Sequence, residues 1–415
     1  MGQGVVVSPF AWWKEADHDA HRAFLAAALG WMLDSFDVML YALVLPSLMR
    51  SLGLASAVGG RLQSVTLIAA AVGGIGFGVL ADRWGRTRAL MLSVLLYSIF
   101  TAACGFAASA VQLGVFRVCL GLGMGGEWAS GAALVSETWP AAHRGKVLAY
   151  MQSAWAIGYA LATLTNWVVQ DALGWSWRAV FFVGVIPALF TLWVRRSVKE
   201  PAVWHAMKAA PRTGGLGATL RGPLLGITIA LCLMNSFTLF AYWGFNTWVP
   251  SYLSASLSAG GLGFSRSTMS GLVFASNIGT WLGYVSFGYI SDAVGRKRSY
   301  VWFLIAAAVL TYAYTLVRSP WALLALGPMT AFFATGNFSG FGAVTAELYP
   351  TAVRATLQGL TYNIGRVASA GAPWLVGALA DARGYPAALS VAAAAFVCAT
   401  LCWIFIPETK GRQMA

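Results

Sequence analysis

The stretch GVLADRWGRTR, residues 78–88, decides the fold because a variant of it, GYISDAVGRKR, returns at residues 288–298. A second stretch, SETWPAAHR at 136–144, returns as AELYPTAVR at 346–354. Both copies start 210 residues after their partners, from 78 to 288 and from 136 to 346. One offset shared by two separate motifs indicates that the chain consists of duplicated halves.

The chain around these motifs is apolar enough to lie in a lipid bilayer. Hydrophobic residues make up 59% and charged residues 10% of the 415 residues, which leaves too little polar side chain to coat a water-soluble particle. Apolar runs of about 18 residues or more, each long enough to cross the hydrocarbon core, recur between short charged breaks. We therefore expect an all-α polytopic membrane protein with twelve transmembrane helices in two pseudo-symmetric six-helix bundles. The expected spans are 24–48, 62–81, 89–109, 112–136, 146–170, 177–195, 223–252, 268–291, 299–317, 321–346, 355–379 and 386–406.

The longest break between spans predicts the division of the chain. From residue 195 to residue 221 it carries six positive charges and two prolines, and it is typical of a linker between two halves. The expected segments are an N-terminal segment 1–23, an N-terminal bundle 24–195, a linker 196–222, a C-terminal bundle 223–406 and a tail 407–415.

Lysine and arginine are unevenly distributed between the two sets of loops. Of the 27 such residues, two lie well inside predicted spans and six lie on the face opposite to the termini: Arg50, Arg61, Arg178, Arg266, Arg318 and Arg383. The positive-inside rule therefore places both termini in the cytoplasm. We expect an integral protein of the plasma membrane, which in a bacterium is the inner membrane, and we expect a monomer.

Several classes of function have no support in the sequence. The formal net charge of +13 comes mostly from short loops rather than from one polar face, so we expect no nucleic acid partner. The five cysteines fall within apolar spans without metal-ligand spacing, so we expect no metal site. Neither a Walker A lysine motif nor a G-x-S-x-G elbow occurs, so we expect neither an enzyme nor a cofactor other than a coupling proton. The glycine-rich stretch 121–131 lies inside an apolar span and indicates close helix packing.

The motifs at the span ends and in the fourth span are those of a known family. Residues 78–86 have the form G-x-L-A-D-R-x-G-R, residues 117–125 have the form R-x-x-x-G-x-x-x-G, VKEPAVW occupies 198–204 and PETKG occupies 407–411. Together they resemble the motifs of the major facilitator superfamily from the first span to the last. The resemblance implies a secondary transporter that works by alternating access in a lipid bilayer.

Charged residues at the cytoplasmic ends of the spans are candidates for a gate. They recur at matched positions in both halves, which favours salt bridges that latch the cytoplasmic side and break when it opens. Charge that only sets topology is the simpler alternative. The candidate gate residues are Asp82, Arg83, Arg86, Glu137, Asp292, Arg296 and Glu347.

Three short stretches narrow the resemblance to one branch. DSFD at 34–37, GMGGEW at 123–128 and NIGR at 363–366 resemble the organic-acid and aromatic-acid proton symporters. This implies symport of a proton and a small organic anion, such as a monocarboxylate or an aromatic acid. Two alternatives stay open. A proton-coupled exporter of drug-like metabolites shares the fold, although the fifth span lacks the G-P signature of such antiporters, and a non-transporting membrane sensor usually carries an output module.

Five charged residues are predicted to lie inside the membrane, where each costs at least about 2.5 to 3.5 kcal/mol near a helix centre. They are Asp34, Asp37, Arg117, Glu127 and Arg366. At a rise of about 1.5 Å per residue, Asp37 and Arg117 reach similar depths, which predicts that they pair. In the sugar-porter-like branch an aspartate of span one pairs with the arginine of span four and carries the proton. By this resemblance Asp37 is the first candidate for proton coupling, followed by Asp34 and Glu127.

Arg366 is predicted to lie near the bilayer midplane in a half that offers no acid inside its spans. A planar guanidinium without a resident carboxylate is suited to holding a substrate carboxylate through two parallel hydrogen bonds. The alternative is a pair across the halves with Asp34, Asp37 or Glu127. The other candidate substrate-binding residues are Gln152, Trp155, Tyr159, Asn235, Tyr242, Asn246, Asn277, Tyr362 and Asn363. Rocking of the halves would couple the two ions, because protonation of Asp37 removes its repulsion of the anion.

Overall fold

The computed structural model describes residues 11–139, 144–199, 223–349 and 354–410, and the regular elements within these ranges are all helical. In the first half they are α1 (Ala11–Lys14), α2 (His18–Leu52), α3 (Ser56–Trp84), α4 (Arg86–Cys104), α5 (Ala110–Thr138), α6 (Arg144–Trp167), the π-helical η1 (Val168–Ala172), α7 (Trp177–Val183) and α8 (Ile186–Ser197). In the second half they are α11 (Pro223–Ser254), η2 (Leu257–Ala259), α12 (Arg266–Val294), α13 (Arg296–Leu316), α14 (Pro320–Gly336), η3 (Asn337–Gly340), α15 (Phe341–Leu348), α16 (Arg354–Ser369), α17 (Ala372–Arg383) and α18 (Tyr385–Cys402).

The predicted architecture of twelve membrane-crossing segments is confirmed. Eight of the described segments are long and apolar enough to cross a membrane: α2, α3, α4, α5, α6 with η1, α11, α13 and α18. A ninth predicted span is the unbroken helix α12. The remaining three, 177–195, 321–346 and 355–379, are interrupted rather than continuous, as α7 and α8, as α14, η3 and α15, and as α16 and α17. In the last case Pro373, in the first turn of α17, fits the start of a helix because its missing N–H is not needed there.

The repeat read from the sequence has a backbone counterpart. Gly85 separates α3 from α4 and Gly295 separates α12 from α13, and both adopt a φ of 114°, a conformation that side chains rarely allow. The two glycines are 210 residues apart, like the motifs that contain them. We call the side of the molecule where they lie the Gly85 end, and the opposite side, where α2 ends before Gly53, the Gly53 end.

Glycine allows the helices of each half to approach closely. In the first half, a Cβ on Gly125 of α5 would collide with the backbone carbonyl of Ala70 on α3. In the second half, a Cβ on Gly279 of α12 would collide with the carbonyl of Pro328 on α14. Such small-residue contacts replace the hydrophobic effect as the source of helix association in lipid. The prediction that the glycine-rich stretch 121–131 packs helices is therefore confirmed.

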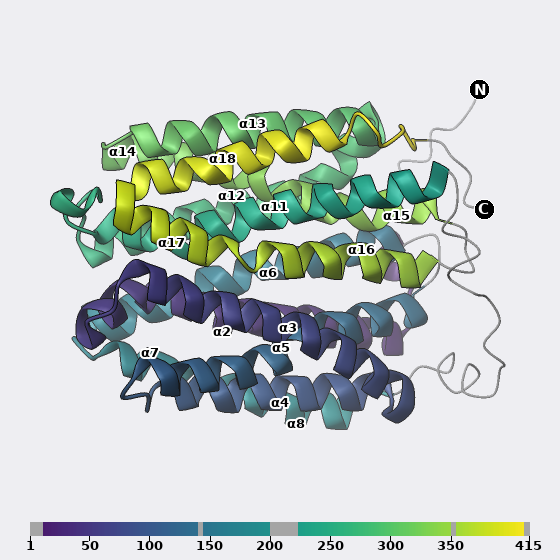
Figure 1. Ribbon diagram of the computed structural model, residues 1–415. Helices are drawn as coiled ribbons and strands as arrows, with labels where there is room; N and C mark the ends of the chain where they lie inside the picture. The colour runs from purple at the N-terminus through teal and green to yellow at the C-terminus, as the bar shows by residue number, and fades with distance from the viewer. Residues whose placement is uncertain (1–10, 140–143, 200–222, 350–353, 411–415) are drawn as a thin grey trace.

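The two halves lie side by side, and the axes of their helices are roughly aligned with one another. Figure 1 shows the first half in purple to teal next to the second half in green to yellow. Helix α3 packs on α17, α6 packs on α12 and α2 packs on α11, and these three pairs form most of the interface between the halves. Smaller contacts join α16 to α3 and both η3 and α15 to α6. The predicted linker lies outside the described residues from residue 200 onward.

Candidate functional site

Two acids of the first half and one arginine of the second half form a buried group where the halves meet. Asp34 of α2 and Glu127 of α5 are 1% and 0% exposed, and Arg366 of α16 is 4% exposed. The positive charge of Arg366 acts on both carboxyl groups, and the two carboxyl groups act on each other. Asp34 Oδ2 and both oxygens of Glu127 have no hydrogen-bond partner in the described part of the chain. Of the predicted charged residues, these three are brought together across the two halves.

The Arg366 guanidinium is held beside an aromatic ring rather than by an acid. Its Cζ lies 5.5 Å from the centre of the Tyr362 ring, one turn earlier on α16. Within the described residues its guanidinium makes no hydrogen bond, and no carboxylate lies within ion-pair distance of it. A buried guanidinium keeps five donors, so Arg366 retains the capacity to bind a planar anion.

The carboxyl group of Asp37 lies inside the first half. It is 1% exposed, and the Thr101 hydroxyl of α4 donates to its Oδ2 at 3.1 Å. Its Oδ1 has no hydrogen-bond partner among the described residues and faces the backbone at Gly184, between α7 and α8. Asp37 is therefore separated from the Arg366 group by about one turn of α2, at three residues of about 1.5 Å each.

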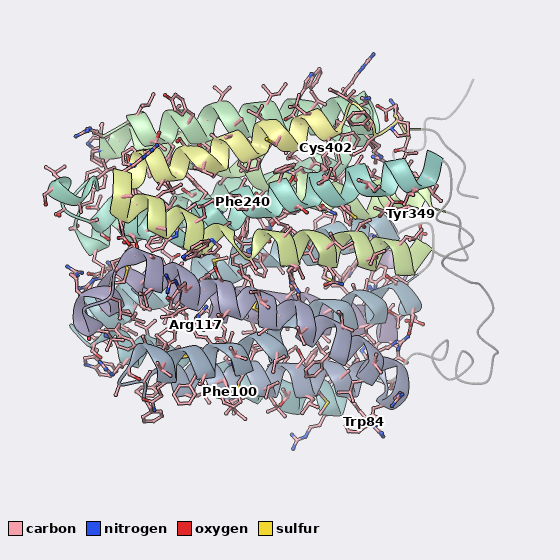
Figure 2. The ribbon with its side chains drawn as sticks, in the orientation of Figure 1. Trp84, Phe100, Arg117, Phe240, Tyr349 and Cys402 are labelled. Carbon is pink, nitrogen blue, oxygen red and sulfur yellow. The ribbon has the colours of Figure 1, made fainter. Side chains whose placement is uncertain are left out.

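Arg117 does not pair with Asp37, so the predicted pair is wrong for this structure. Its Nε donates to the Leu62 carbonyl oxygen at 3.1 Å, and its Nη2 donates to Gln63 Oε1. Its Cζ lies 3.7 Å from the centre of the Tyr41 ring. Similar depth in the membrane did not fix the direction of the side chain, and α3 and Tyr41 satisfy the guanidinium instead. Figure 2 shows Arg117 within the first half, toward the end opposite to Trp84 and Tyr349.

Aromatic side chains close the interface next to this charged group. The Trp155 indole N–H of α6 donates to the Tyr242 hydroxyl of α11 at 2.5 Å, which joins the two halves. Trp31 of α2 lies 4.6 Å from Trp155, and Phe338 of η3 lies 5.6 Å from Tyr242, measured between ring centres. The predicted residues Trp155 and Tyr242 therefore form part of an aromatic wall at the interface.

The other predicted substrate-binding residues divide into two groups. Asn235 and Asn277 are buried, and Asn235 Nδ2 and Asn277 Oδ1 have no partner among the described residues, so each keeps a free polar atom. The Gln152 side chain of α6 acts on the Tyr284 hydroxyl of α12 across the halves, and Tyr159 is buried on α6. By contrast, the amide groups of Asn246 and Asn363 donate to carbonyl oxygens one turn earlier in their own helices, at 3.1 and 2.9 Å.

The predicted gate residues pair within each half. Arg86 Nη2 lies 2.9 Å from Glu137 Oε1, and Arg296 Nη2 lies 3.0 Å from Glu347 Oε1, so the repeat preserves one ion pair in both halves. Asp292 also pairs with Arg296. Arg83 is exposed, and the side chain of Asp82 lies outside the described residues. Since each pair joins helices of one half, these pairs brace the loop motif rather than bridge the halves.

Glu408 of the predicted PETKG tail completes the second of these clusters. Its carboxylate accepts the backbone N–H groups of Arg296 and Lys297, at 2.8 and 3.1 Å, at the start of α13. Partial burial works to raise the pKa of Glu408, but backbone N–H groups, led by that of Lys410, hold this pKa below its usual value. The carboxylate thus caps α13 in its ionised form.

Charged contacts between the halves lie at the Gly53 end. Asp381 of α17 accepts the backbone N–H groups of Ser56 and Ala57, at 3.1 and 2.8 Å, and so caps the start of α3, whose own N-cap residue provides no side-chain cap. Arg266 of α12 lies 3.6 Å from Asp171 of η1. These contacts join the two halves at the Gly53 end.

Sequence reasoning missed residues that complete these groups. They are Thr101 beside Asp37, Gln63 and Tyr41 beside Arg117, and Asp381 at the start of α3. Thr101 and Tyr97, four residues apart on α4, were the available signal, since they place two hydroxyls on one face of an apolar span. The partners of Arg117 gave no such signal. In the described part of the chain no group of three histidine, cysteine or acidic residues has the arrangement of a metal site.

Comparison with known proteins gives consistent matches over the whole chain. A family model described as Major Facilitator Superfamily matches residues 27–261 and 231–413. A protein of Cupriavidus pinatubonensis described as "Probable 4-methylmuconolactone transporter" is 34% identical over 97% of this chain and 94% of its own length. The cis,cis-muconate transport protein of Acinetobacter baylyi is 32% identical over 95% and 96%. The crystal structure of a D-xylose-proton symporter superposes with a TM-score of 0.76 at 22% identity, covering 95% of this chain and 99% of the other, and so shares the fold.

Proposed function

The chain belongs to the major facilitator superfamily, and from this premise we propose that it carries a small organic anion across the membrane together with a proton. The family is one of secondary transporters, so the chain is not an enzyme. The resemblance read from the sequence motifs is thereby confirmed, and the relatives named above belong to its aromatic-acid branch.

One observation carries the proposal, namely the buried guanidinium of Arg366 facing two acids without an ion pair to either among the described residues. A permanent pair would satisfy the guanidinium and leave no donor for a ligand. An arginine that is attracted by Asp34 and Glu127 but not bound by them can exchange those acids for a carboxylate of the substrate.

This arrangement supports a simple coupling mechanism. Substrate carboxylate and the two acids compete for one positive charge, because both acids act electrostatically on Arg366. When the acids are ionised, they neutralise Arg366 and repel an incoming anion. When a proton neutralises one of them, the guanidinium is released for substrate and the repulsion falls. Anion and proton then occupy the site together and cross as the halves rock about their interface.

The names of the relatives support an organic acid as the substrate. The two proteins named above are described as a probable transporter of 4-methylmuconolactone and a transport protein for cis,cis-muconate, and muconate is a dicarboxylate. The wall of Trp31, Trp155 and Tyr242 beside Arg366 offers flat apolar faces for a planar, unsaturated or aromatic acid. We assign Asn235 and Asn277, with their free amide atoms, to the polar part of such a ligand.

The orientation of the chain follows from its charges. We assign the Gly85 end to the cytoplasm because most lysines and arginines outside the spans belong to loops on that side. Both termini are then cytoplasmic, bundles 24–195 and 223–406 flank the transport path, and the bacterial inner membrane is the site of action. The chain acts as a monomer, since both halves of the path belong to one polypeptide. The Gly53 end, closed by Asp381, faces outward.

Transport by purified protein in liposomes tests the proposal. The vesicles contain a pH-sensitive dye and receive cis,cis-muconate, benzoate, a neutral sugar or a cationic drug on the outside. We expect one or both acids to acidify the interior. Arg366→Lys replaces the planar guanidinium by an ammonium group, which cannot donate two parallel hydrogen bonds to a carboxylate. The loss of one hydrogen bond to a charged group, worth about 1.5 to 3 kcal/mol, should raise the half-saturating acid concentration about tenfold or more.

Two further variants sharpen the result. Asp34→Asn should retain exchange of the acid across the membrane while acidification falls, because one of the two carboxyl groups that can take up the proton beside Arg366 is then lost and only Glu127 remains. Arg383→Lys, on the exposed end of α17, is the matched control and should behave as wild type. Alkalinisation of the interior by the sugar or the cationic drug, with no response to either acid, would overturn symport in favour of an exporter.

A further inference from the structure

Tyr97 of α4 is a buried polar residue that the mechanism above does not use. Its side chain is 0% exposed, and its hydroxyl makes no hydrogen bond within the described residues. An unsatisfied buried hydroxyl costs about 1 to 3 kcal/mol. A phenylalanine of the same shape would avoid this cost, so the hydroxyl itself calls for an explanation.

The position of Tyr97 follows from the direction of its helix. Helices α2 and α4 both start at the Gly85 end and run parallel. Thr101 of α4 is level with Asp37 of α2, since its hydroxyl donates to Asp37 Oδ2 at 3.1 Å. Tyr97 lies four residues before Thr101, and Asp34 lies three residues before Asp37, so they are displaced toward the Gly85 end by about 6 Å and about 4.5 Å. Tyr97 is therefore level with Asp34.

Helix α5 brings the third acid to the same place. Gly123 of α5 packs against Tyr97 so closely that a Cβ on it would meet the Tyr97 backbone nitrogen at 2.7 Å. Glu127 follows Gly123 by one turn. Glu127 also packs against Gly30, one turn of α2 before Asp34, so α2, α4 and α5 converge here. The carboxyl groups of Asp34, Asp37 and Glu127 all act electrostatically on the Tyr97 hydroxyl.

We propose that the Tyr97 hydroxyl relays the proton between the aspartates of α2 and Glu127 of α5. The inference rests on the proposed proton symport and adds to it a path within the first half. Asp34 and Asp37 stand on one helix and Glu127 on another, and Glu127 accepts no hydrogen bond from the described residues. A hydroxyl level with Asp34 that can both donate and accept a hydrogen bond is suited to joining the two sides, and a phenol does both.

The relay step breaks and forms equal numbers of O–H bonds. A protonated Asp34 gives its proton to the phenol oxygen, so the carboxylic O–H bond breaks and a new phenolic O–H bond forms. At the same time the original phenolic O–H bond breaks, and its proton binds an oxygen of ionised Glu127. The phenol is neutral before and after the step, and one proton has moved from α2 to α5. Arg366 stands beside the acids at both ends of this path.

Tyr97→Phe tests the relay by separating two transport modes. The first is acidification of vesicles driven by cis,cis-muconate, which needs net proton movement. The second is exchange of labelled for unlabelled muconate at equal concentration and pH, which needs none. We expect Tyr97→Phe to keep exchange within about twofold of wild type and to lower acidification at least tenfold. Tyr300→Phe is the matched control, because Tyr300 is equally buried with an unpartnered hydroxyl but lies on α13 of the other half.

A second measurement needs no transport. Infrared spectra of the purified protein, recorded over a range of pH without substrate, report the C=O stretch of protonated carboxyl groups. We expect Tyr97→Phe to shift this titration and Tyr300→Phe to leave it unchanged. Wild-type acidification in Tyr97→Phe, an equal fall of exchange and acidification, or an unchanged titration overturns the relay. Failure of the wild type to acidify with any acid overturns the symport instead, while the infrared titration still decides whether Tyr97 joins the acids.

Discussion

Arg117 and Arg366 are both buried arginines, but their surroundings give them different roles. Arg117 is held by a backbone carbonyl, a glutamine and the face of Tyr41, all from the first half. Arg366 has one aromatic neighbour and two acids that attract it from the other half. A guanidinium with fixed partners braces helices, whereas one without them is available to a ligand.

Removal of the Gln63 side-chain amide should therefore destabilise the first half. In Gln63→Leu the Arg117 guanidinium loses a hydrogen bond to a charged group, worth about 1.5 to 3 kcal/mol, at a fully buried position. We expect a lower melting temperature in detergent, measured by thermal-shift fluorescence. Gln63→Glu is the matched control, since its carboxylate can accept the same bond. If Gln63→Leu has the melting temperature of the wild type, the hydrogen bond between Arg117 and Gln63 does not stabilise the first half.

At this scale the sequence predicts which charges are buried but not their partners. The cost of a charge in lipid identified Asp34, Asp37, Arg117, Glu127 and Arg366 without a structure. The pairing of Asp37 with Arg117 was inferred from depth along the helices, and depth does not define the rotation of each helix about its axis. The competing acceptors of Arg117, a carbonyl oxygen and Gln63, lie on a different helix that gave no signal.

At the scale of the elements, glycine sets how closely α3 and α5 approach. Gly125→Ala should disrupt this contact, because its Cβ would meet the Ala70 carbonyl oxygen and the Gly74 backbone nitrogen, neither of which can move alone. Overpacking of this kind costs about 1 to 3 kcal/mol. We expect less monodisperse protein in size-exclusion chromatography. Gly76→Ala, on an exposed face of α3 with no atom near the added Cβ, should be neutral or slightly stabilising, and an equal loss in both variants would contradict this account.

The cap on α13 should depend on pH. The pKa of Glu408 is lower in the folded chain than its usual value of 4.5, so the ionised form stabilises the fold. This stabilisation is complete above the usual pKa and is lost as pH falls through the lowered one. We expect the first-turn amides of α13 to lose protection against deuterium exchange, relative to the intrinsic exchange rate at each pH, only below about pH 4.5. In Glu408→Gln they should exchange faster at neutral pH as well. Fast exchange in wild type at neutral pH would contradict the cap.

The apolar stretches and the repeated loop motifs of the sequence predicted where the helices lie, but they did not predict where helices are interrupted. Apolar length located all twelve segments, and the loop motifs located the turns at Gly85 and Gly295. The breaks within three predicted spans depend on local backbone geometry, such as the short helix Asn337–Gly340, which apolar length does not report. The roles of these segments in transport remain predictions.

At the scale of the whole molecule, the described residues join the two halves by charged contacts at the Gly53 end, while the ion pairs Arg86–Glu137 and Arg296–Glu347 of the Gly85 end each stay within one half. Asp381→Ala should therefore shift the molecule toward opening at the Gly53 end. Loss of a helix cap costs about 1 kcal/mol, which changes the ratio of closed to open molecules about fivefold. Spin labels at the exposed positions 61 and 383 report this opening. The distance between the two labels, measured by double electron–electron resonance spectroscopy, should become longer.

The control for this experiment keeps the acceptor and removes the charge. Asp381→Asn retains a side-chain oxygen for the amides of Ser56 and Ala57, so its distance distribution should stay close to that of wild type. The labels are introduced after replacement of the five native cysteines. If Asp381→Ala leaves the distances unchanged, other contacts hold the Gly53 end closed.

The cap that α17 lends to α3 bears on the energy of the whole cycle. When the halves part at the Gly53 end, the first amides of α3 exchange one carboxylate for water molecules, and the carboxylate exchanges amides for water in turn. This cap therefore contributes only about 1 kcal/mol to the free-energy difference between the two states. A contribution of this size does not by itself hold the molecule in one state, and the binding of one proton or one anion can outweigh it.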